Sequence, residues 1–381
     1  MNRSVYITRL ASFLPNEPIS NDQMESILGL INGQPSKAKP LILRNNQIKK
    51  RYYALDKDGQ TTHTNAELTK VAITKLFDSD FDLSKLEILS CGTTTPDQLL
   101  PAHAAMVHGE LGGHAIEINS TTGACSAGIQ AMKFGYLSVL SGQAENAVCT
   151  GSDRFSKWML AKFFKEEAAK VAKLEGDGII AFEKDFLRFM LSDGAGAALL
   201  QPTPNPNGLS LKIEWIEQRS FAHELPTCMY AGSIKDSAGK LIGWSDMDQE
   251  QWSGQSVFAI KQDTKLLGDF IVKKGMELLK NILAVKKFDI ENITYFLPHL
   301  SSQYFASRIA NELELIGIGI PVSKWFTNLS WVGNVGAASP YLMLEELFNS
   351  GKLKKGDTLL MGVPESARFN YAYVMLTVVE S

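Results

Sequence analysis

The sequence contains no run of apolar residues that approaches the roughly 18 needed for a membrane-spanning helix, so we expect no membrane span. The first eight residues lack a long apolar stretch and a cleavage site, so we expect no signal peptide. The four cysteines show no CxxC spacing, and no His, Cys or Asp spacing resembles a metal site. We therefore expect free thiols, a reducing cytoplasmic compartment and no metal. A net charge of −3 leaves no basic excess for nucleic-acid binding.

What the sequence does have is length and an alternating pattern. Its 381 residues, 45% of them hydrophobic, suffice for one large core or for two closely packed halves. Thr64 and Glu67 have the spacing of a capping box before a predicted helix at 68–77. Short apolar stretches predict buried strands at 5–13, 86–91, 148–151 and 195–200. Strands that alternate with helices are typical of an α/β fold.

Two segments of the first half recur in the second half. Residues 81–89 resemble residues 288–296, at an offset of 288 − 81 = 207. Residues 120–128 resemble residues 330–338, at an offset of 330 − 120 = 210. A repeat this long is not a solenoid unit. It predicts a duplicated α/β domain with two mixed sheets that are flanked and separated by helices.

The duplication divides the chain into an N-terminal half, 1–205, and a C-terminal half, 206–381. In such a fold the loops at matching strand ends face one cleft. We therefore expect the turns that carry Cys125, His299 and Asn334 to converge there.

Cys125 lies where a predicted strand at 115–118 turns into a predicted helix at 126–140. The free N–H groups and the positive end of the helix dipole favour a thiolate at that position. A thiolate is the nucleophilic form, so this placement suits covalent catalysis. The alternative is that Cys125 is a small buried apolar residue, as most free cysteines are. The Gly, Ala and Ser residues beside it fit both interpretations.

His299 and Asn334 are the candidate partners of Cys125. His299 follows the repeated strand, and a strand end suits a site residue better than a helix face; otherwise it is a surface or core histidine. Asn334 is either a turn asparagine with a left-handed backbone or an amide that donates to a developing oxyanion. Together the three suit thioester chemistry, in which Cys125 takes an acyl group. His299 and Asn334 would hold the carbonyl oxygen of a second thioester while its enolate forms, without a metal.

Four motifs carry a resemblance that runs from Val5 to Val379. They are Gly-Ala-Cys-Ser-Ala-Gly at 123–128, Leu-Ser-Asp-Gly-Ala-Gly-Ala-Ala at 191–198, Leu-Pro-His at 297–299 and Gly-Asn-Val-Gly-Ala-Ala-Ser at 333–339. In these motifs the chain resembles the β-ketoacyl-acyl-carrier-protein synthase III family, which are thiolase-fold condensing enzymes. The resemblance implies duplicated α/β halves in a five-layered αβαβα arrangement, and a homodimer. It also implies acyl-carrier-protein or coenzyme A thioesters as substrates, and no further cofactor.

The resemblance also implies roles for individual residues. Cys125 would be the acylated nucleophile, with its backbone N–H in a first oxyanion hole. His299 and Asn334 would form the second oxyanion site. Residues 45–51 are similar to the family's segment near the entrance for the carrier pantetheine. Arg44 is a candidate contact there, whereas a solvated basic turn is the alternative for the neighbouring lysines.

The chain departs from the family pattern in three places. The segment after His299 lacks the usual Gln-Ala-Asn and has no arginine until Arg308, so the usual carrier contact is in doubt. The glycine-rich loop near the active site is replaced at 362–370, which includes Glu365, Ser366 and Ala367. We therefore expect a different pocket shape there, with these three residues as candidate substrate contacts.

The third departure is an insertion of about 157–189. Its segment 163–174 is amphipathic, which predicts a helix that covers the acyl pocket or the dimer interface, or a solvated surface helix.

These departures are similar to those of ketosynthases from dialkylresorcinol and flexirubin-type pigment pathways. That resemblance implies joining a β-ketoacyl thioester to an α,β-unsaturated acyl thioester, which gives a dialkyl cyclohexanedione. Some relatives that join two acyl chains use a glutamate base where this chain has Leu100. Glu365 is a candidate replacement base, and otherwise a salt-bridged structural carboxylate. Asp97 is expected to cap the helix that follows it.

Two other activities remain open. One is a priming synthase that condenses acetyl-CoA with malonyl-carrier protein and needs only a short pocket. The other is a Cys125-dependent acyltransferase to oxygen or nitrogen, which would not need the His299 and Asn334 pair. A non-catalytic partner subunit would usually lack the cysteine, so the presence of Cys125 argues against that class.

Overall fold

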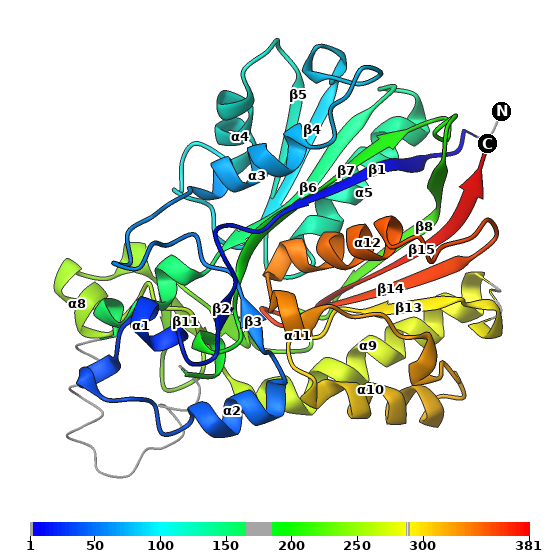
Figure 1. Cartoon of the computed structure of the whole chain (residues 1–381). Coiled ribbons are helices and arrows are strands. Elements are labelled where there is room, and N and C mark those ends of the chain that lie inside the picture. The colour runs from blue at the N-terminus through cyan, green and yellow to red at the C-terminus, as the bar shows by residue number, and fades with distance from the viewer. Residues whose placement is uncertain (1–2, 165–184, 287, 289) are drawn as a thin grey trace.

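The computed structural model describes residues 3–164, 185–286, 288 and 290–381. The predicted amphipathic segment at 163–174 therefore lies almost wholly outside the described residues. The main β-sheet has nine strands in the order β13-β14-β15-β8-β1-β7-β6-β4-β5 (Figure 1). Along the chain these are β1 (Tyr6–Phe13), β4 (Ile88–Thr93), β5 (Glu117–Thr122), β6 (Ala147–Arg154), β7 (Asp193–Gln201), β8 (Leu209–Ser220), β13 (Tyr295–Pro298), β14 (Thr358–Glu365) and β15 (Asn370–Glu380).

Helices and short strands occupy the connections. The α-helices are α1 (Met24–Leu28), α2 (Lys39–Asn46), α3 (Asn65–Thr74), α4 (His103–Leu111), α5 (Ala127–Ser141), α8 (Gln249–Gly254), α9 (Thr264–Lys286), α10 (Tyr304–Leu315), α11 (Leu329–Val332) and α12 (Ser339–Asn349). The short strands are β2 (Ile19–Ser20), β3 (Lys50–Arg51), β9 (Met229–Tyr230), β10 (Ser233–Lys235), β11 (Leu241–Gly243) and β12 (Lys261–Gln262). The predicted capping box is confirmed, because the Thr64 side chain and Glu67 cap the start of α3 reciprocally.

The two halves of the chain repeat one strand pattern. In the first half β4 pairs parallel with β6, which pairs antiparallel with β7, which pairs antiparallel with β1. In the second half β13, β14, β15 and β8 pair in the same order and the same directions. The duplicated α/β fold predicted from the sequence is therefore confirmed.

The sequence offset of 207 reappears in the strand register. Leu89 of β4 pairs with Ile118 of β5, and 207 residues later Phe296 of β13 forms an isolated parallel bridge with Trp325. This bridge is what the second half has in place of β5. The two half-sheets were predicted as separate, but β1 and β8 join them through the antiparallel pairs Tyr6–Lys212 and Ile7–Leu211.

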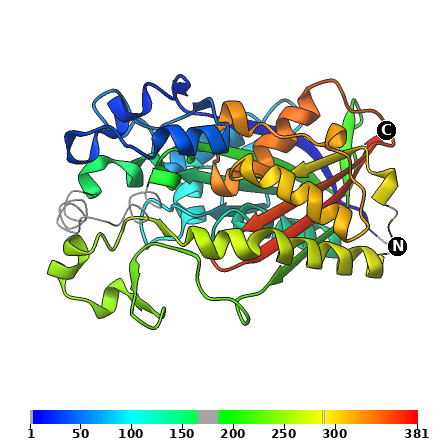
Figure 2. The ribbon, with the colours of Figure 1, turned by 90° about the horizontal axis from the view of Figure 1, so that it is seen from below.

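The fold has five layers, in which helices cover the outer face of each half-sheet and lie between the two half-sheets. Three hydrophobic clusters pack these layers together. One packs α3 and α4 on the first half-sheet, one packs α5 and α12 between the half-sheets, and one packs α9 and α10 on the second half-sheet. Figure 2 shows α9 and α10 along strands β14 and β15. Successive residues of β15 alternate between layers: Val374 faces the central cluster, and Tyr373 and Met375 face α9. Burial on both faces explains why these strands read as continuous apolar runs.

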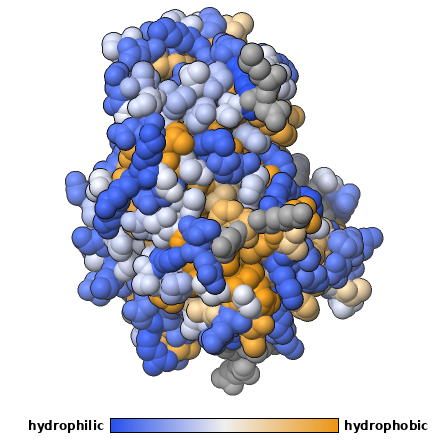
Figure 3. Space-filling view, turned by 90° about the vertical axis from the view of Figure 1, so that its right-hand side faces the viewer, coloured by the Kyte–Doolittle hydropathy of each residue, from blue (hydrophilic) through white to orange (hydrophobic). Residues whose placement is uncertain are grey.

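The surface is mixed in character. On the face drawn in Figure 3, hydrophilic side chains surround an irregular hydrophobic area. Within the described residues, no helix combines the length and apolar character that crossing a membrane demands.

Glycines allow the two halves to approach closely. A Cβ added at Gly151 of β6 would lie 2.1 Å from the carbonyl oxygen of Ala337, and one added at Gly128 of α5 would lie 2.4 Å from it. Real Cβ atoms do not approach a backbone oxygen so closely, because the backbone would have to move. The turn before α12 is therefore packed directly against the turn and strand ends of the first half.

We predict that Gly151→Ala lowers the free energy of unfolding by about 1–3 kcal/mol or more, because the added methyl overpacks this contact. Urea unfolding followed by circular dichroism measures the effect. Gly109→Ala in α4 is the matched control, since no atom lies within 4 Å of the added Cβ. It should raise the stability by about 0.5–1 kcal/mol through helix propensity. Equal stabilities of the two variants would contradict the close packing at Ala337.

Candidate active site

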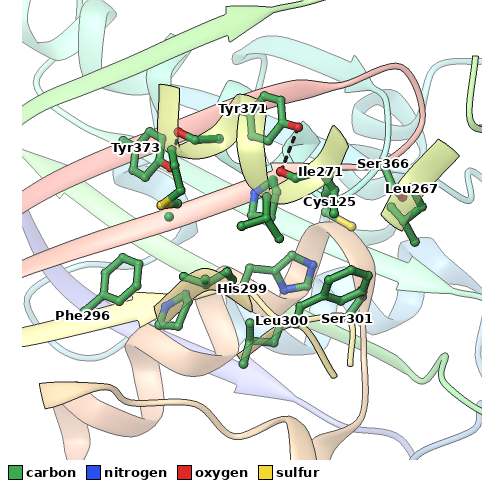
Figure 4. A pocket seen from close by; sticks show the side chains of 18 residues that line it. Cys125, Leu267, Ile271, Phe296, His299, Leu300, Ser301, Ser366, Tyr371 and Tyr373 are labelled. Carbon is green, nitrogen blue, oxygen red and sulfur yellow. Dashed lines mark hydrogen bonds between the residues drawn. The ribbon is translucent and has the colours of Figure 1, made fainter. Parts of the chain in front are cut away.

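Cys125 lies in the turn between the edge strand β5 and helix α5. The predicted strand ends later than expected, at Thr122, and the helix begins at Ala127. The Cys125 side chain is buried, and it lines a small cavity of about 50 Å³ together with His299. Figure 4 shows the thiol and the imidazole at this shared space, coming from opposite halves of the chain. The predicted convergence of the Cys125 and His299 turns is therefore seen.

The protonation state of Cys125 differs from our expectation. Burial raises the pKa of the thiol well above its usual range, and the nearby carboxyls of Glu365 and Asp153 raise it further. Burial and these two carboxyls oppose the thiolate that we expected at the start of α5. Loss of hydration and two carboxyl neighbours outweigh the helix dipole, whose effect is confined to the first turn. This balance favours the neutral form of the Cys125 thiol.

His299 directly follows β13 and is held by its backbone, whose N–H donates to the carbonyl of Gly362 at 2.8 Å. The side chain is 3% exposed, and its Nε2 is buried without a hydrogen-bond partner among the described residues. Burial lowers the pKa of His299 from 6.5 to about 4, so the ring is neutral at pH 7. A neutral imidazole with the proton on Nε2 can donate one hydrogen bond to a carbonyl oxygen in the cavity.

The cavity walls are almost entirely apolar. They come from one face of α9, from the first turns of α10 and from β13, β14 and β15; the aliphatic and aromatic lining residues are Leu267, Ile271, Val272, Met276, Phe296, Leu300, Phe305, Ile309, Tyr371 and Tyr373. The Tyr371 hydroxyl donates to the carbonyl of Ile271 at 3.0 Å, and the Tyr373 hydroxyl donates to that of Gly275 at 2.8 Å (Figure 4). These two bonds fix α9 on the sheet and so fix the width of the cavity.

Asn334 lies in the turn between α11 and α12 but is not among the residues that line this cavity. Its Oδ1 accepts from the N–H of Gly336 at 2.9 Å, and its carbonyl accepts from the N–H of Ser192 at 2.8 Å. Those bonds hold the turn against the start of β7. The pairing of Asn334 with His299 in an enolate site stays a prediction, with the side-chain N–H₂ as the group that would donate.

The three candidates from the altered loop lie in different environments. Ser366 lines the cavity with Cys125 and His299. Ala367 lines a second, larger cleft, and its carbonyl accepts from the N–H groups of Cys228 and Met229. Glu365 lines neither space; its buried side chain accepts from the Ser126 hydroxyl at 2.5 Å. No ion pair involving Glu365 is present in the described part of the chain, so the alternative of a salt-bridged carboxylate does not describe it.

Arg44 is exposed in the last turn of α2. Its neighbours touch the segment just after His299, because the carbonyl of Asn45 accepts from the Ser302 hydroxyl at 3.3 Å. Arg44 therefore lies at the surface near this segment, outside the cavity that holds Cys125.

The loop at 97–101 contains Asp97, the expected helix cap, and Leu100, which stands where some relatives have a glutamate base. Asp97 does cap a helix, but the helix is α3 rather than the following α4: its carboxylate accepts from the N–H groups of Asn65 and Ala66 at 2.9 and 3.0 Å. The capped helix precedes Asp97 in the sequence, so neighbouring positions could not have identified it. Leu100 is 85% exposed and contributes no side chain to either space near Cys125.

The sequence analysis missed Asp153. This carboxylate, at the end of β6, is fully buried and accepts from the N–H groups of Thr94, Thr95 and Ala337 at 2.7, 2.9 and 2.7 Å. Burial raises the pKa of Asp153 from 3.8 to about 6, against the effect of these bonds. The signal that could have found Asp153 is its position just after the predicted buried strand at 148–151. Asp153 ties three loops together around the Cys125 turn.

Among the residues that the structure describes, no group of three or more His, Cys, Asp or Glu side chains could hold a metal ion. The four cysteines, Cys91, Cys125, Cys149 and Cys228, are free and buried.

Comparisons with known proteins agree with this architecture. Residues 283–363 match the family model for the C terminal of 3-oxoacyl-[acyl-carrier-protein (ACP)] synthase III. The β-ketoacyl-[acyl-carrier-protein] synthase III of Clostridium perfringens strain SM101 is 26% identical over 352 residues, which cover 92% of each chain. That of Clostridioides difficile strain 630 is 24% identical over 95% of this chain and 94% of its own.

Solved structures show the same fold. AbyA1, a tetronic acid condensing enzyme, superposes with a TM-score of 0.76 at 19% identity, over 98% of this chain and 99% of its own. OleA of Xanthomonas campestris, with bound lauric acid and lauroyl-CoA, superposes with a TM-score of 0.74 at 18% identity, over 99% and 100%. The synthase III FabH of Pseudomonas aeruginosa PAO1 gives 0.71 at 18% identity, over 100% and 99%.

The duplicated halves, with Cys125 and His299 meeting between them, thus form a thiolase-like fold. The C-terminal match and the similarity along nearly the whole chain make the protein similar to the ACP synthase III family.

We predict that His299 stays neutral far below the pH at which histidine usually titrates. At pH 5 about a tenth of His299 should be protonated, compared with nearly all of an ordinary histidine, because burial disfavours the charged ring. Carbon-13 NMR of histidine-labelled protein between pH 8 and 5 measures this. His299→Gln assigns the signal, and His103→Gln assigns the other histidine whose pKa burial lowers to about 4. A His299 signal that titrates near pH 6.5 would contradict the closed apolar cavity.

Proposed function

We propose that this protein is a ketosynthase, a transferase that loads an acyl group on Cys125 and then joins it to a second acyl thioester by a C–C bond. The observation that carries the proposal is the single apolar cavity lined by a cysteine thiol and by a neutral histidine with an unpartnered Nε2. Similarity to synthase III enzymes supports the same reaction type. We expect no cofactor beyond the thioester substrates.

The first half-reaction is a transthioesterification. The sulfur of Cys125 attacks the carbonyl carbon of an acyl thioester, and the new S–C bond forms as the donor's C–S bond breaks. The proton of the Cys125 thiol ends on the departing thiol of coenzyme A or of the carrier pantetheine. The backbone N–H of Cys125 is the expected donor to the oxyanion of this step.

The second half-reaction forms the carbon skeleton. The carbonyl oxygen of the second thioester accepts a hydrogen bond from Nε2 of His299, and we propose the Asn334 amide as a second donor. Negative charge that develops on this oxygen is stabilised strongly because the cavity excludes water. The α-C–H bond of the second thioester breaks to give the enolate. Its carbon attacks the acyl carbon on Cys125, a C–C bond forms, the S–C bond to Cys125 breaks, and the α-proton ends on the departing Cys125 sulfur.

Two apolar spaces lie at the Cys125 turn, and the larger one supports a substrate that carries an alkyl chain. The first is the cavity of about 50 Å³ that reaches from Cys125 towards α9. The second is a cleft of about 670 Å³ that includes Gly123 and Ala124 in its wall. Aromatic side chains line this second cleft: Trp158, Phe163, Tyr230, Trp244 and Phe258. An acetyl group would leave most of it empty.

We therefore propose that the substrates are a β-ketoacyl thioester and an α,β-unsaturated acyl thioester, joined to a dialkyl cyclohexanedione precursor of dialkylresorcinols. The solved OleA structure holds lauric acid and lauroyl-CoA, so this fold accommodates long alkyl chains in that protein. The second candidate is the priming reaction of acetyl-CoA with malonyl-ACP, which the names of the curated relatives and the small Cys125–His299 cavity favour.

We propose further that the protein acts in the cytoplasm as a homodimer. The edge strand β5 lacks a neighbour on its outer side in the described sheet, and exposed apolar side chains lie nearby at Leu99, Leu100 and Ile118. Exposed sheet edges of this kind are ready to pair with another strand. Arg44, exposed near the segment after His299, is the proposed contact for a carrier protein or for coenzyme A.

Variants should separate the two half-reactions. Incubation with an acyl thioester should add one acyl mass to the wild-type chain, and Cys125→Ala should abolish the addition because no nucleophile remains. His299→Ala and Asn334→Ala should still be acylated but should condense at least 100-fold more slowly, because an oxyanion donor is lost. Intact-protein mass spectrometry and product assays measure the two steps. Acylation of Cys125→Ala, or normal condensation by both other variants, would refute these roles.

Product analysis should separate the two candidate reactions. We expect medium-chain β-ketoacyl and enoyl thioesters, supplied together, to give one product that contains both chains. Acetyl-CoA with malonyl-ACP should give little product. Mass spectrometry of the extracted products measures this, and the Cys125→Ala protein is the blank. A product formed from acetyl and malonyl donors alone would instead support the priming reaction.

A further inference from the structure

Glu365 is a buried carboxylate that the reaction scheme above does not use. It is the last residue of β14, it is 6% exposed, and it lines neither of the two spaces at the Cys125 turn. Its side chain instead points at the start of α5, where Oε2 lies 3.4 Å from the position that a Cβ on Gly123 would occupy. The carboxylate thus lies behind the turn that presents Cys125.

Glu365 is held against this turn by one side-chain bond. The Ser126 hydroxyl donates to Oε2 at 2.5 Å, and the backbone N–H groups of Ala124 and Ser126 lie near the carboxyl group and act to lower its pKa. The direction of the hydroxyl bond is fixed, because Ser126 Oγ itself accepts from Asn370 Nδ2 at 2.9 Å and from Gln130 Nε2 at 3.3 Å. Donors of this kind favour the ionised form of a carboxyl group, although burial raises the pKa of Glu365.

The two backbone amides flank Cys125 on either side. At the N-terminus of a 15-residue helix such as α5, free amides would normally stabilise an anion, and a cysteine thiolate is the anion that this turn could provide. The Glu365 carboxyl group lies on the side of the turn where such an anion would be stabilised.

The other ionisable groups that face Cys125 either raise the pKa of its thiol, as Glu365 does, or are neutral. Asp153, from β6, adds a second carboxyl whose effect also raises the pKa of the Cys125 thiol. His299, which follows β13, shares the cavity and is neutral. Helices α9 and α10 contribute apolar side chains to the same cavity, so no cation from them offsets the carboxylates.

We propose that Glu365 is a positioning residue that Ser126 holds behind the Cys125 turn, facing its amides, and that it thereby keeps the unacylated Cys125 as a neutral thiol. This inference rests on Cys125 being the nucleophile of the proposed function, and it adds the control of that nucleophile. A thiol reacts slowly with general electrophiles because the thiolate is the reactive form. Cys125 is then protected in the resting protein, and its proton must leave during acylation.

The test is the pH dependence of Cys125 alkylation by iodoacetamide without any substrate, read by mass spectrometry. In the wild type we expect the midpoint of the rate profile to lie above about 8.5, the value for an ordinary cysteine. In Glu365→Gln, which keeps the shape and removes the charge, the midpoint should fall by a unit or more. A one-unit fall gives about ten times more thiolate at pH 7, and the lower nucleophilicity of that thiolate reduces the gain in rate to about three- to fourfold.

Three variants serve as controls. Cys125→Ser gives the background from the other buried cysteines. Glu365→Asp retains the charge and should keep the midpoint near that of the wild type. Ser126→Ala removes the hydroxyl donor while Glu365 and the amides remain, so its midpoint should move less than that of Glu365→Gln. Thermal unfolding by circular dichroism checks that each variant is folded.

A wild-type midpoint at or below about 8.5 would overturn the proposal without any variant. An unchanged or higher midpoint in folded Glu365→Gln would also overturn it. These outcomes are distinct from failure of the proposed function. That function fails if acyl thioesters do not load Cys125, whatever the alkylation profile shows.

Discussion

The contact between the two halves at Ala337 sets the geometry of everything around Cys125. The Ala337 carbonyl oxygen packs so closely on β6 and α5 that only glycine fits at Gly128 and Gly151. The Ala337 N–H donates to the buried carboxylate of Asp153 at 2.7 Å, which also accepts from the N–H of Thr94 at 2.7 Å. One turn of the C-terminal half is thereby locked to two loops of the N-terminal half. A shift of this turn would therefore also move the loops around Cys125.

The two halves use equivalent turns for different purposes. In the first half, the turn after β5 presents Cys125 at the start of α5. In the second half, the strand that would match β5 is reduced to the Phe296–Trp325 bridge, and the following turn, with Asn334, serves to pack against β7. The strand ends divide in the same way, since β13 leads to His299 and its counterpart β4 leads to the Thr94 loop that Asp153 holds. One half therefore supplies the proposed nucleophile, Cys125, and the other supplies the proposed hydrogen-bond donor, His299.

Repeated segments and local turn patterns in the sequence predicted much of this arrangement. The offset of 207 residues identified the duplication, and the strand-end positions of Cys125 and His299 identified the residues that line one cavity. Those features depend on periodicity and on local turns, which a sequence displays directly. The helix capped by Asp97 was misassigned because Asn65 lies 32 residues earlier in the chain, and only folding brings the two together.

The charge state of Cys125 illustrates why the rest could not be predicted. The local sequence shows a cysteine at the start of a helix, which favours a thiolate. The opposing groups are Glu365, 240 positions away, and Asp153, together with burial that only the packed fold produces. Burial is a property of the whole core, so the balance between the helix dipole and desolvation cannot be read from a motif.

The proposed site is therefore built around two groups whose neutral forms burial favours. Burial in an apolar cavity raises the pKa of the Cys125 thiol and lowers the pKa of the His299 imidazole. In such surroundings a fixed N–H donor stabilises developing negative charge more strongly than it would in water, because no solvent competes for it. A neutral donor also leaves the enolate reactive, since it shares a hydrogen bond instead of transferring a proton. The low polarity that suppresses the resting thiolate is thus the same property that makes His299 an effective partner for a carbonyl oxygen.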